Sequence, residues 1–343
     1  MPSLEISKPE YAGQHNLMGG RSDLEEAKSV NNRFNSPFVI VGPPGVDENS
    51  VAEMLKAIGT QASTAGDLFP KVAHEGPCRI CGETRMLTEE HIPPRGAFNK
   101  ERGRTVEVGA LLGREELEMP DEGEVFQGGI SGFTLCEDCN NLTGTRWGRQ
   151  YQEWARRAAW LMRSQPQLPP EVDETPGYAR FPSVTFKEVF PGRLVRQVLS
   201  MMLSISGSAE LGRRFSDVRE LVLGGSARPL PEPLRLYFLL YGSSTARICG
   251  GEQGQAWWSV SERVLRRILS VDFCPLAFVL LIEGPKIPAL GVDISSFTTW
   301  EVHKPGGDVE FSNLPLGFGH KPWPADYRSR GQMLADRVEL DGE

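Results

Sequence analysis

The chain of 343 residues has the composition of a soluble protein, with 39% hydrophobic and 24% charged residues. Its length predicts about two domains, and its composition excludes wholesale disorder. The formal charge of −8 and the pI of about 5.4 disfavour a protein that coats nucleic acid without specificity. Gly (37 residues) and Pro (26 residues) are enriched, which predicts long loops rather than a helical bundle.

No apolar run approaches the roughly 18–20 residues of a membrane span, since the longest extends from Leu276 to Ile282. The N-terminus has no apolar core of the signal-peptide kind, so we expect a cytoplasmic protein that does not bind membranes. Six cysteines are too few for a disulfide scaffold. Four of them form two CxxC pairs, a pattern that in a reducing compartment indicates metal binding.

In chain order, residues 1–36 are polar and aperiodic, and we expect a flexible segment there. Residues 37–75 combine a short apolar run, a GPPG turn and a helical pattern, which predict a strand–helix lead-in. The loop GPPGVDENS lacks the Gly-Lys-Ser/Thr sequence of a phosphate-binding loop, so an ordinary turn is predicted. Residues 76–165 contain the CxxC pairs and form the next unit, and the Pro-rich residues 166–178 form a linker.

Residues 179–325 are predicted to form a separate α+β domain, which is followed by a polar tail at residues 326–343. Its clearest predicted elements are helices at 194–205 and 211–223 and strands at 234–241 and 276–282. The two remaining cysteines, Cys249 and Cys274, are expected to be buried thiols of this domain. No motif in it indicates a role.

The two CxxC pairs, Cys78–Cys81 and Cys136–Cys139, have the spacing of zinc knuckles. Each knuckle presents two thiolates, and two knuckles complete a tetrahedral zinc site of the closed, structural kind. The 54 residues between the pairs exceed the needs of a minimal zinc ribbon. We therefore expect the metal to hold this intervening segment in place.

Within that segment, Glu90 and His91 stand directly before Ile-Pro-Pro. Consecutive strand residues point to opposite faces, so Glu90 and His91 can share a site only at a strand end or a bulge. The prolines Pro93 and Pro94 predict such a strand end. Glu89 is the alternative carboxylate to Glu90.

A helix is predicted from about residue 140 to residue 163. At 100° per residue its apolar side chains fall within about 80° of arc, and Asn140 shares that arc. These apolar residues are Trp147, Tyr151, Trp154, Ala158 and Leu161. We expect this face to point toward the strands that carry Glu90 and His91. The opposite face is a candidate phosphate track or else a solvated surface, and its arginines are Arg146, Arg149, Arg156, Arg157 and Arg163.

The ordered set of CxxC, EHIPP and CxxCN resembles the HNH (His-Me finger) endonucleases. It is most similar to the EHxxP-type proteins and to the branch with a four-cysteine zinc and a final Asn, as in phage recombination endonuclease VII. The resemblance covers residues 76–165, about a quarter of the chain. It implies a ββα-metal unit, in which two strands and a helix pack together around a catalytic cation.

By this resemblance, His91 corresponds to the general base that activates the attacking water, a task that suits a neutral imidazole. Glu90 and Asn140 correspond to the ligands of a catalytic cation, Mg²⁺ or Mn²⁺, which would stabilise the leaving 3′-oxygen. The structural zinc has four thiolate ligands and no open position, so it would take no part in the chemistry.

The sequence departs from the family at two places. The middle Asn, which ties down the loop that carries the His, has no obvious counterpart, and Ser131 stands near its expected slot. The connection from His91 to Cys136 is long, and it holds six acids and no base between Glu115 and Glu124. This insertion is a substrate-selecting loop, an inhibitory acidic flap or plain decoration.

The sequence thus predicts a metal-dependent HNH-type endonuclease that hydrolyses phosphodiester bonds, in DNA rather than RNA. Restriction or phage defence is the setting of many standalone proteins that it resembles. The domain at 179–325 would then supply specificity, contacts with a partner protein or a second copy, or regulation. The alternative is a non-catalytic, zinc-stapled module that docks nucleic acid or protein. Nucleic acid remains compatible with the acidic chain, because residues 146–163 carry five Arg and a single Glu.

Overall fold

The computed structural model describes residues 69–105, 124–164 and 179–317, apart from short gaps at 208, 243–245, 251–254, 260–263, 288–289 and 305. The predicted flexible segment, most of the lead-in, the linker at 166–178, the tail and nearly all of the acidic insertion lie outside the described residues. Within the described part of the chain, no helix has the length and apolar character that a membrane crossing requires.

A small antiparallel sheet holds the motifs that the sequence singled out. Its strands, in the order β1-β2-β5, are β1 (Glu75–Pro77), β2 (Thr84–His91) and β5 (Ser131–Cys136). A two-stranded ribbon, β3 (Gly103–Thr105) and β4 (Glu124–Phe126), lies between β2 and β5 in the sequence. A nearly continuous helix follows β5 and comprises α5 (Glu137–Thr143), the π-helical segment η1 (Gly144–Gly148) and α6 (Arg149–Ser164).

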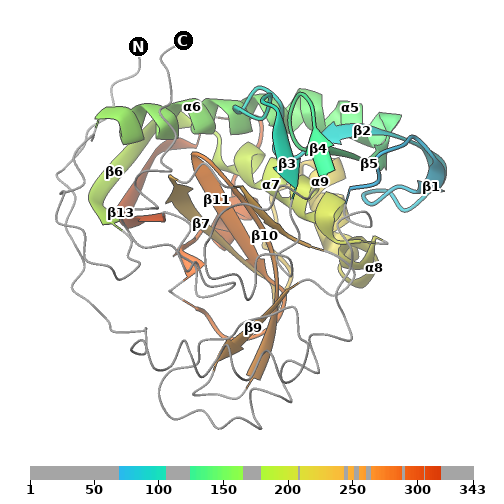
Figure 1. Ribbon diagram of the computed structural model, residues 1–343. Coiled ribbons are helices and arrows are strands. Elements are labelled where there is room, and N and C mark those ends of the chain that lie inside the picture. The colour runs from blue at the N-terminus through green and yellow to red at the C-terminus, as the bar shows by residue number, and fades with distance from the viewer. Residues whose placement is uncertain are drawn as a thin grey trace, which may run out of the picture.

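The second half of the chain forms one large mixed sheet, with most of the helices on one side of it (Figure 1). Its path is β6-β13-β7-β11-β10-β8, with β9 added beside β10 and β12 beside β7. The strands are β6 (Ala179–Val189), β7 (Arg235–Tyr241), β8 (Arg247–Cys249), β9 (Gln255–Ser259), β10 (Val264–Phe273), β11 (Leu276–Leu281), β12 (Val292–Asp293) and β13 (Gly307–Gly317). The helices are α7 (Pro191–Ile205), α8 (Glu210–Arg214), α9 (Ser216–Gly224) and the 3-10 turn η3 (Ser295–Thr299).

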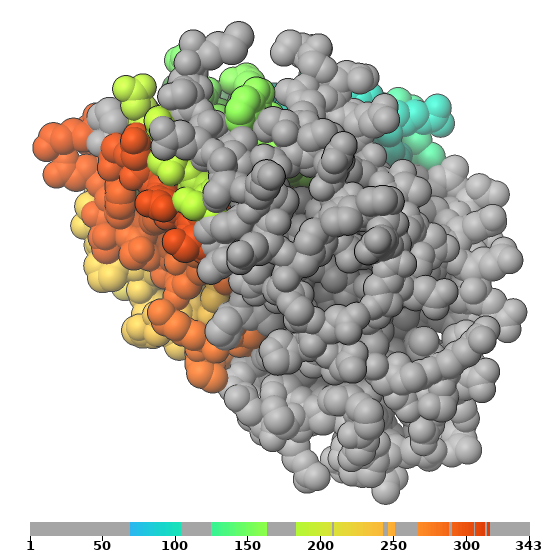
Figure 2. All heavy atoms as spheres, turned by 90° about the vertical axis from the view of Figure 1, so that its left-hand side faces the viewer, coloured from blue at the N-terminus to red at the C-terminus, as the bar shows by residue number. Residues whose placement is uncertain are grey.

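The apolar runs at residues 234–241 and 276–282 form β7 and β11, in the middle of this sheet. Strand β11 is buried along its whole length, as expected for a strand with apolar residues on both faces. Strand β6 pairs with β13 at the sheet edge, and Figure 2 views the molecule from the side of these two strands. The predicted helix at 211–223 is divided at Phe215 into α8 and α9, and Gly225 ends α9 with a left-handed φ of 68°. The α+β class is confirmed.

Helix α6 packs directly on the large sheet. The Trp154 indole stacks on Phe186 with ring centroids 4.5 Å apart, and it meets Phe238 and Phe311 edge-on. One cluster of buried apolar residues extends from Phe69 to Leu314. The core therefore continues across the boundary that the sequence predicted at residues 166–178. The apolar arc of α6 covers the large sheet rather than the strands that carry Glu90 and His91, which corrects the expectation for that face.

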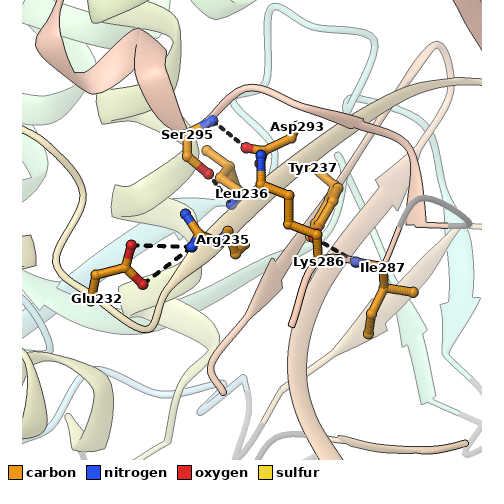
Figure 3. A network of polar contacts seen from close by, with 8 residues as sticks. All are labelled: Glu232, Arg235, Leu236, Tyr237, Lys286, Ile287, Asp293 and Ser295. Atoms are coloured by element: carbon orange, nitrogen blue, oxygen red, sulfur yellow. Dashed lines mark hydrogen bonds and ion pairs between the residues drawn. The ribbon is translucent and has the colours of Figure 1, made fainter. Parts of the chain in front are cut away.

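A polar network joins the start of strand β7 to the segments that carry Lys286, Ile287, Asp293 and Ser295 (Figure 3). The Tyr237 hydroxyl accepts a hydrogen bond from the Ile287 backbone N–H at 2.9 Å. The Asp293 carboxylate accepts one from the Ser295 N–H at 3.0 Å and forms a 3.1 Å ion pair with Lys286. Burial alone would raise the pKa of Asp293, but the Ser295 hydrogen bonds and the Lys286 charge outweigh it and lower that pKa.

We expect Asp293→Asn to lower the free energy of unfolding at neutral pH, because the variant loses this ion pair. The Asp293 pKa is lower in the folded chain than the ordinary value of 3.8, so its contribution is present above that value and is lost as the pH falls through the folded pKa. Urea unfolding of the wild type and the variant should therefore differ most at neutral pH and converge as the pH falls below the folded pKa of Asp293. A difference that stays constant over this range would contradict the assignment.

Candidate functional site

The four cysteines of the CxxC pairs converge at one end of the small sheet. Their sulfur atoms all lie within 4.8 Å of one another, and those of Cys81 and Cys136 are 3.9 Å apart. Tetrahedral Zn–S bonds of about 2.3 Å place sulfur atoms about 3.8 Å apart, so the spacing fits. The cluster is therefore positioned to bind a metal ion such as zinc, as the sequence predicted.

Local structure explains how each pair presents its thiols. Cys78 and Cys81 lie in the turn between β1 and β2, where the Gly82 N–H donates to the Cys78 carbonyl at 2.8 Å and Gly82 has a φ of 79°. Cys136 ends β5 and precedes α5, and Cys139 lies in the first turn of that helix. The acidic residues of this turn suit a helix N-terminus.

Thiols of this cluster change one another's pKa values. The hydrogen bond from the Cys139 thiol lowers the pKa of Cys78 well below its usual value, and the same bond raises the pKa of Cys139. Burial raises the pKa of Cys81. Four thiolates in such a buried cluster need a cation between them, which agrees with a closed metal site.

Arginines tie the metal centre to the helices of the second half of the chain. Arg219 on α9 donates to the Cys81 carbonyl, and Arg79 donates to the Ser204 carbonyl at the end of α7. Trp147 of η1 donates from its indole N–H to the Val222 carbonyl at 3.0 Å. The small sheet and the metal centre are thus fixed against α7 and α9.

His91 stands at the last position of β2, and its ring is held by one defined hydrogen bond. Its Nε2 lies 3.0 Å from the Gly128 carbonyl oxygen. Because a carbonyl can only accept, Nε2 carries the proton in the neutral ring, and Nδ1 is left as a proton acceptor. The ring is half-buried, and in this tautomer Nδ1 is the nitrogen that can accept a proton.

Glu90 does not join His91 in one site, which corrects the sequence prediction. Its carboxylate is buried, with 5% of its surface exposed, and it accepts hydrogen bonds from Ser204 Oγ at 2.6 Å and Thr134 Oγ1 at 3.1 Å. Burial raises the pKa of Glu90 to about 7. The pairing of β2 with β5 has a bulge between Thr88 and Glu89, and the extra residue, Thr134, lies in β5. Strand β2 therefore keeps its alternation, and Glu90 and His91 point to opposite faces.

Glu89 is the carboxylate on the same face of β2 as His91. It is exposed, and it accepts a hydrogen bond from Ser131 Oγ at 2.7 Å. Asn140, as predicted, faces β2, where its Nδ2 donates to the Glu89 carbonyl at 2.8 Å and to Thr88 Oγ1 at 3.1 Å. Both contacts use Nδ2, so Oδ1 of Asn140 is left as a ligand atom. Glu89 is thus the carboxylate that shares a face with His91, whereas Thr88, which Asn140 contacts, shares the Glu90 face of β2.

Asn99 ties down the loop after His91, a contact that sequence reasoning missed. Its side chain is 1% exposed, and its Nδ2 donates to the Pro93 carbonyl at 2.6 Å and to the Ile130 carbonyl at 2.9 Å. Its Oδ1 accepts from the Ile130 N–H at 2.6 Å. It therefore ties the loop after His91 to the start of β5. Ser131, near the expected slot, contacts Glu89 instead.

The five arginines of the candidate phosphate track have different surroundings. Arg157 is 13% exposed, pairs with Glu153 at 3.0 Å and donates to the Lys187 carbonyl, so it is committed to internal contacts. Arg146 donates to the Leu223 carbonyl at 3.3 Å. Arg156 is 59% exposed and lies 3.8 Å from Glu153, a weak surface pair. Arg149 is exposed, whereas nothing is described of the Arg163 side chain.

No family model matches the chain, and neither a curated protein nor a solved structure matches it. The resemblance to HNH endonucleases therefore depends on the motifs and on the geometry above.

Cys136→Ser is expected to lose the bound metal, because a closed site needs all four thiolates. Metal content per chain, measured on purified protein, should fall from about one zinc toward zero. Cys249→Ser is the matched control, since Cys249 is a buried cysteine outside the cluster. Full zinc occupancy in the Cys136→Ser protein would refute the four-thiolate site.

Asn99→Ala should destabilise the loop after His91 while leaving the metal bound. The substitution removes the Asn99 contacts of the buried Pro93 carbonyl and Ile130 N–H, whereas the Ile130 carbonyl keeps the Ile92 N–H as a donor. Each unsatisfied group costs about 1–3 kcal/mol. We expect urea unfolding to show a loss of about 2 kcal/mol or more, with unchanged zinc content. A variant as stable as the wild type would show that Asn99 does not hold the loop.

Proposed function

We propose that the chain is a metal-dependent endonuclease of the HNH type, which hydrolyses phosphodiester bonds in DNA. The observation that carries the proposal is the His91 ring, whose Nε2–H is held by the Gly128 carbonyl at 3.0 Å so that Nδ1 can accept a proton. The order of strand, strand and helix in β2, β5 and α5 agrees with a ββα-metal unit. The four-thiolate centre holds this unit together and has no open position for chemistry.

Each residue of the site has a defined task in this proposal. His91 Nδ1 takes the proton from the water that attacks the phosphorus. The Glu89 carboxylate and Asn140 Oδ1 would hold a hard divalent cation, for which oxygen ligands are suited, and Asn140 would have to reach past β2 to the His91 face. When bound, Mg²⁺ or Mn²⁺ supplies stabilisation of the charge on the phosphate and the leaving 3′-oxygen. The exchange of Glu90 for Glu89 is the one change from the roles that the resemblance implied.

Glu90 acts as a structural group in this proposal. Its hydrogen bond from Ser204 at 2.6 Å joins β2 to α7, and its burial directs the neighbouring Glu89 and His91 outward. A neutral Gln at this position keeps the size of the side chain and an oxygen that accepts the same hydrogen bonds.

A second candidate is a metal-stapled module that binds nucleic acid or protein without cutting it. The burial of Glu90 favours this candidate, because the carboxylate that directly precedes His91 then points into the interior, away from the His91 ring. The two candidates differ in whether Glu89 takes over the role of that carboxylate.

Plasmid cleavage in Mg²⁺ or Mn²⁺ separates the candidates. The wild type should nick supercoiled DNA, and EDTA should stop it. His91→Ala and Glu89→Gln should each lower the rate about 10²-fold or more, because a general base or a cation ligand is lost. Glu90→Gln is the matched control and should cut within a few-fold of the wild type.

Equal nicking by the wild type and His91→Ala would reject His91 as the base. Loss of activity in Glu90→Gln with full activity in Glu89→Gln would return the ligand role to Glu90. A zinc-loaded, folded wild type without any cleavage would favour the binding module.

A further inference from the structure

Two exposed arginines lie beside the candidate site. Arg95 and Arg149 are exposed, and neither forms a hydrogen bond or ion pair with another residue in the described part of the chain. Most other arginines there are engaged, as Arg146 and Arg157 are. A guanidinium without a carboxylate partner keeps its five donors available, in a fork that matches phosphate.

Arg95 lies against the residue that holds the His91 ring. Its Nη2 is 3.8 Å from the position that a Cβ would take on Gly128, and the Gly128 carbonyl accepts from His91 Nε2. Backbone bond lengths then place the guanidinium within about 11 Å of the His91 ring nitrogen. Each strand of duplex DNA carries a phosphate per about 3.4 Å of axis. Arg95 can therefore reach a phosphate within about three nucleotides of one held at His91.

Arg149 is brought to the same region by the contact between α6 and the loop after His91. The Gln152 carboxamide packs against Gly96, which has no side chain. A Cβ at Gly96 would lie only 2.5 Å from Gln152 Oε1. Arg149 stands three residues before Gln152 and therefore lies on the same face of the helix. Gly96 directly follows Arg95 in the chain, so the two arginines flank one contact between α6 and the loop.

Acidic side chains near this region do not neutralise the two arginines. Glu153 is paired with Arg157 and Arg156, and the Glu89 carboxylate accepts from Ser131. Glu101 is exposed and forms no ion pair with another described residue. Among the described residues, the two guanidinium groups thus have no carboxylate partner, in a chain whose formal charge is −8.

We infer that Arg95 and Arg149 form a contact surface for the phosphate backbone of duplex DNA, beside His91. The inference rests on the proposed function and adds to it the residues that hold the strand near the bond to be cut. Two isolated contacts in an acidic protein give weak, salt-sensitive binding. With so few contacts, the protein would bind a DNA segment that also fits the site, and it would not bind anionic surfaces without specificity.

DNA binding without cleavage tests the surface separately from the nuclease proposal. Fluorescence anisotropy of a labelled duplex of about 30 base pairs, in EDTA and with the His91→Ala chain, gives the binding constant over a series of salt concentrations. Arg95→Gln and Arg149→Gln, each added to His91→Ala, should weaken binding and reduce the slope of log K against log salt by about 1. Arg213→Gln is the matched control, because Arg213 is an exposed arginine on α8 whose side chain forms no hydrogen bond or ion pair with another described residue.

The outcomes of this experiment are distinct. Unchanged slopes in Arg95→Gln and Arg149→Gln, or no binding of the duplex at all, would overturn the surface. Reduced slopes together with a wild type that never cuts plasmid would leave the surface in place and reject the nuclease. Normal cleavage with unchanged slopes would reject the surface alone.

Discussion

The helix that runs from Glu137 to Ser164 is the constraint on which the rest of the structure depends. Its first turns carry Cys139 and Asn140, and its last turns carry Trp154, which is fully buried among aromatic rings of the large sheet. Removal of such an aromatic side chain typically costs 3–5 kcal/mol, so the far end of the helix is firmly anchored. The position of the metal centre and of Asn140 is therefore set by packing that lies several turns away.

A second constraint is the buried carboxylate of Glu90. Its contacts with Ser204 and Thr134 join the small sheet to α7, in an interior where an unpaired carboxylate would be costly. Once Glu90 points inward, strand alternation turns Glu89 and His91 toward the other face. The same strand thus separates a structural carboxylate from an exposed one, although the two residues are neighbours in the chain.

Much of this arrangement could be predicted from the sequence, where the signal is local. The CxxC spacing indicated the metal cluster, and the apolar runs indicated α7, β7 and β11. Other features depend on tertiary contacts that no local pattern contains. The buried Glu90 carboxylate accepts a hydrogen bond from a serine 114 residues away. Asn99 lies in a loop without a regular pattern and contacts Ile130, directly before β5. The π-helical segment η1 changes the angular register of the helix, so Asn140 and Trp154 contact different neighbours despite their shared predicted arc.

The location of the second cation tests the central claim most directly. Crystals of the zinc-loaded protein, soaked in Mn²⁺ and measured at the manganese absorption edge, would show where that ion binds by anomalous scattering. The account predicts a manganese peak between the Glu89 carboxylate and Asn140 Oδ1, on the His91 face of β2 and separate from the four-cysteine centre. A peak on Glu90, or manganese at no position near His91, would contradict it.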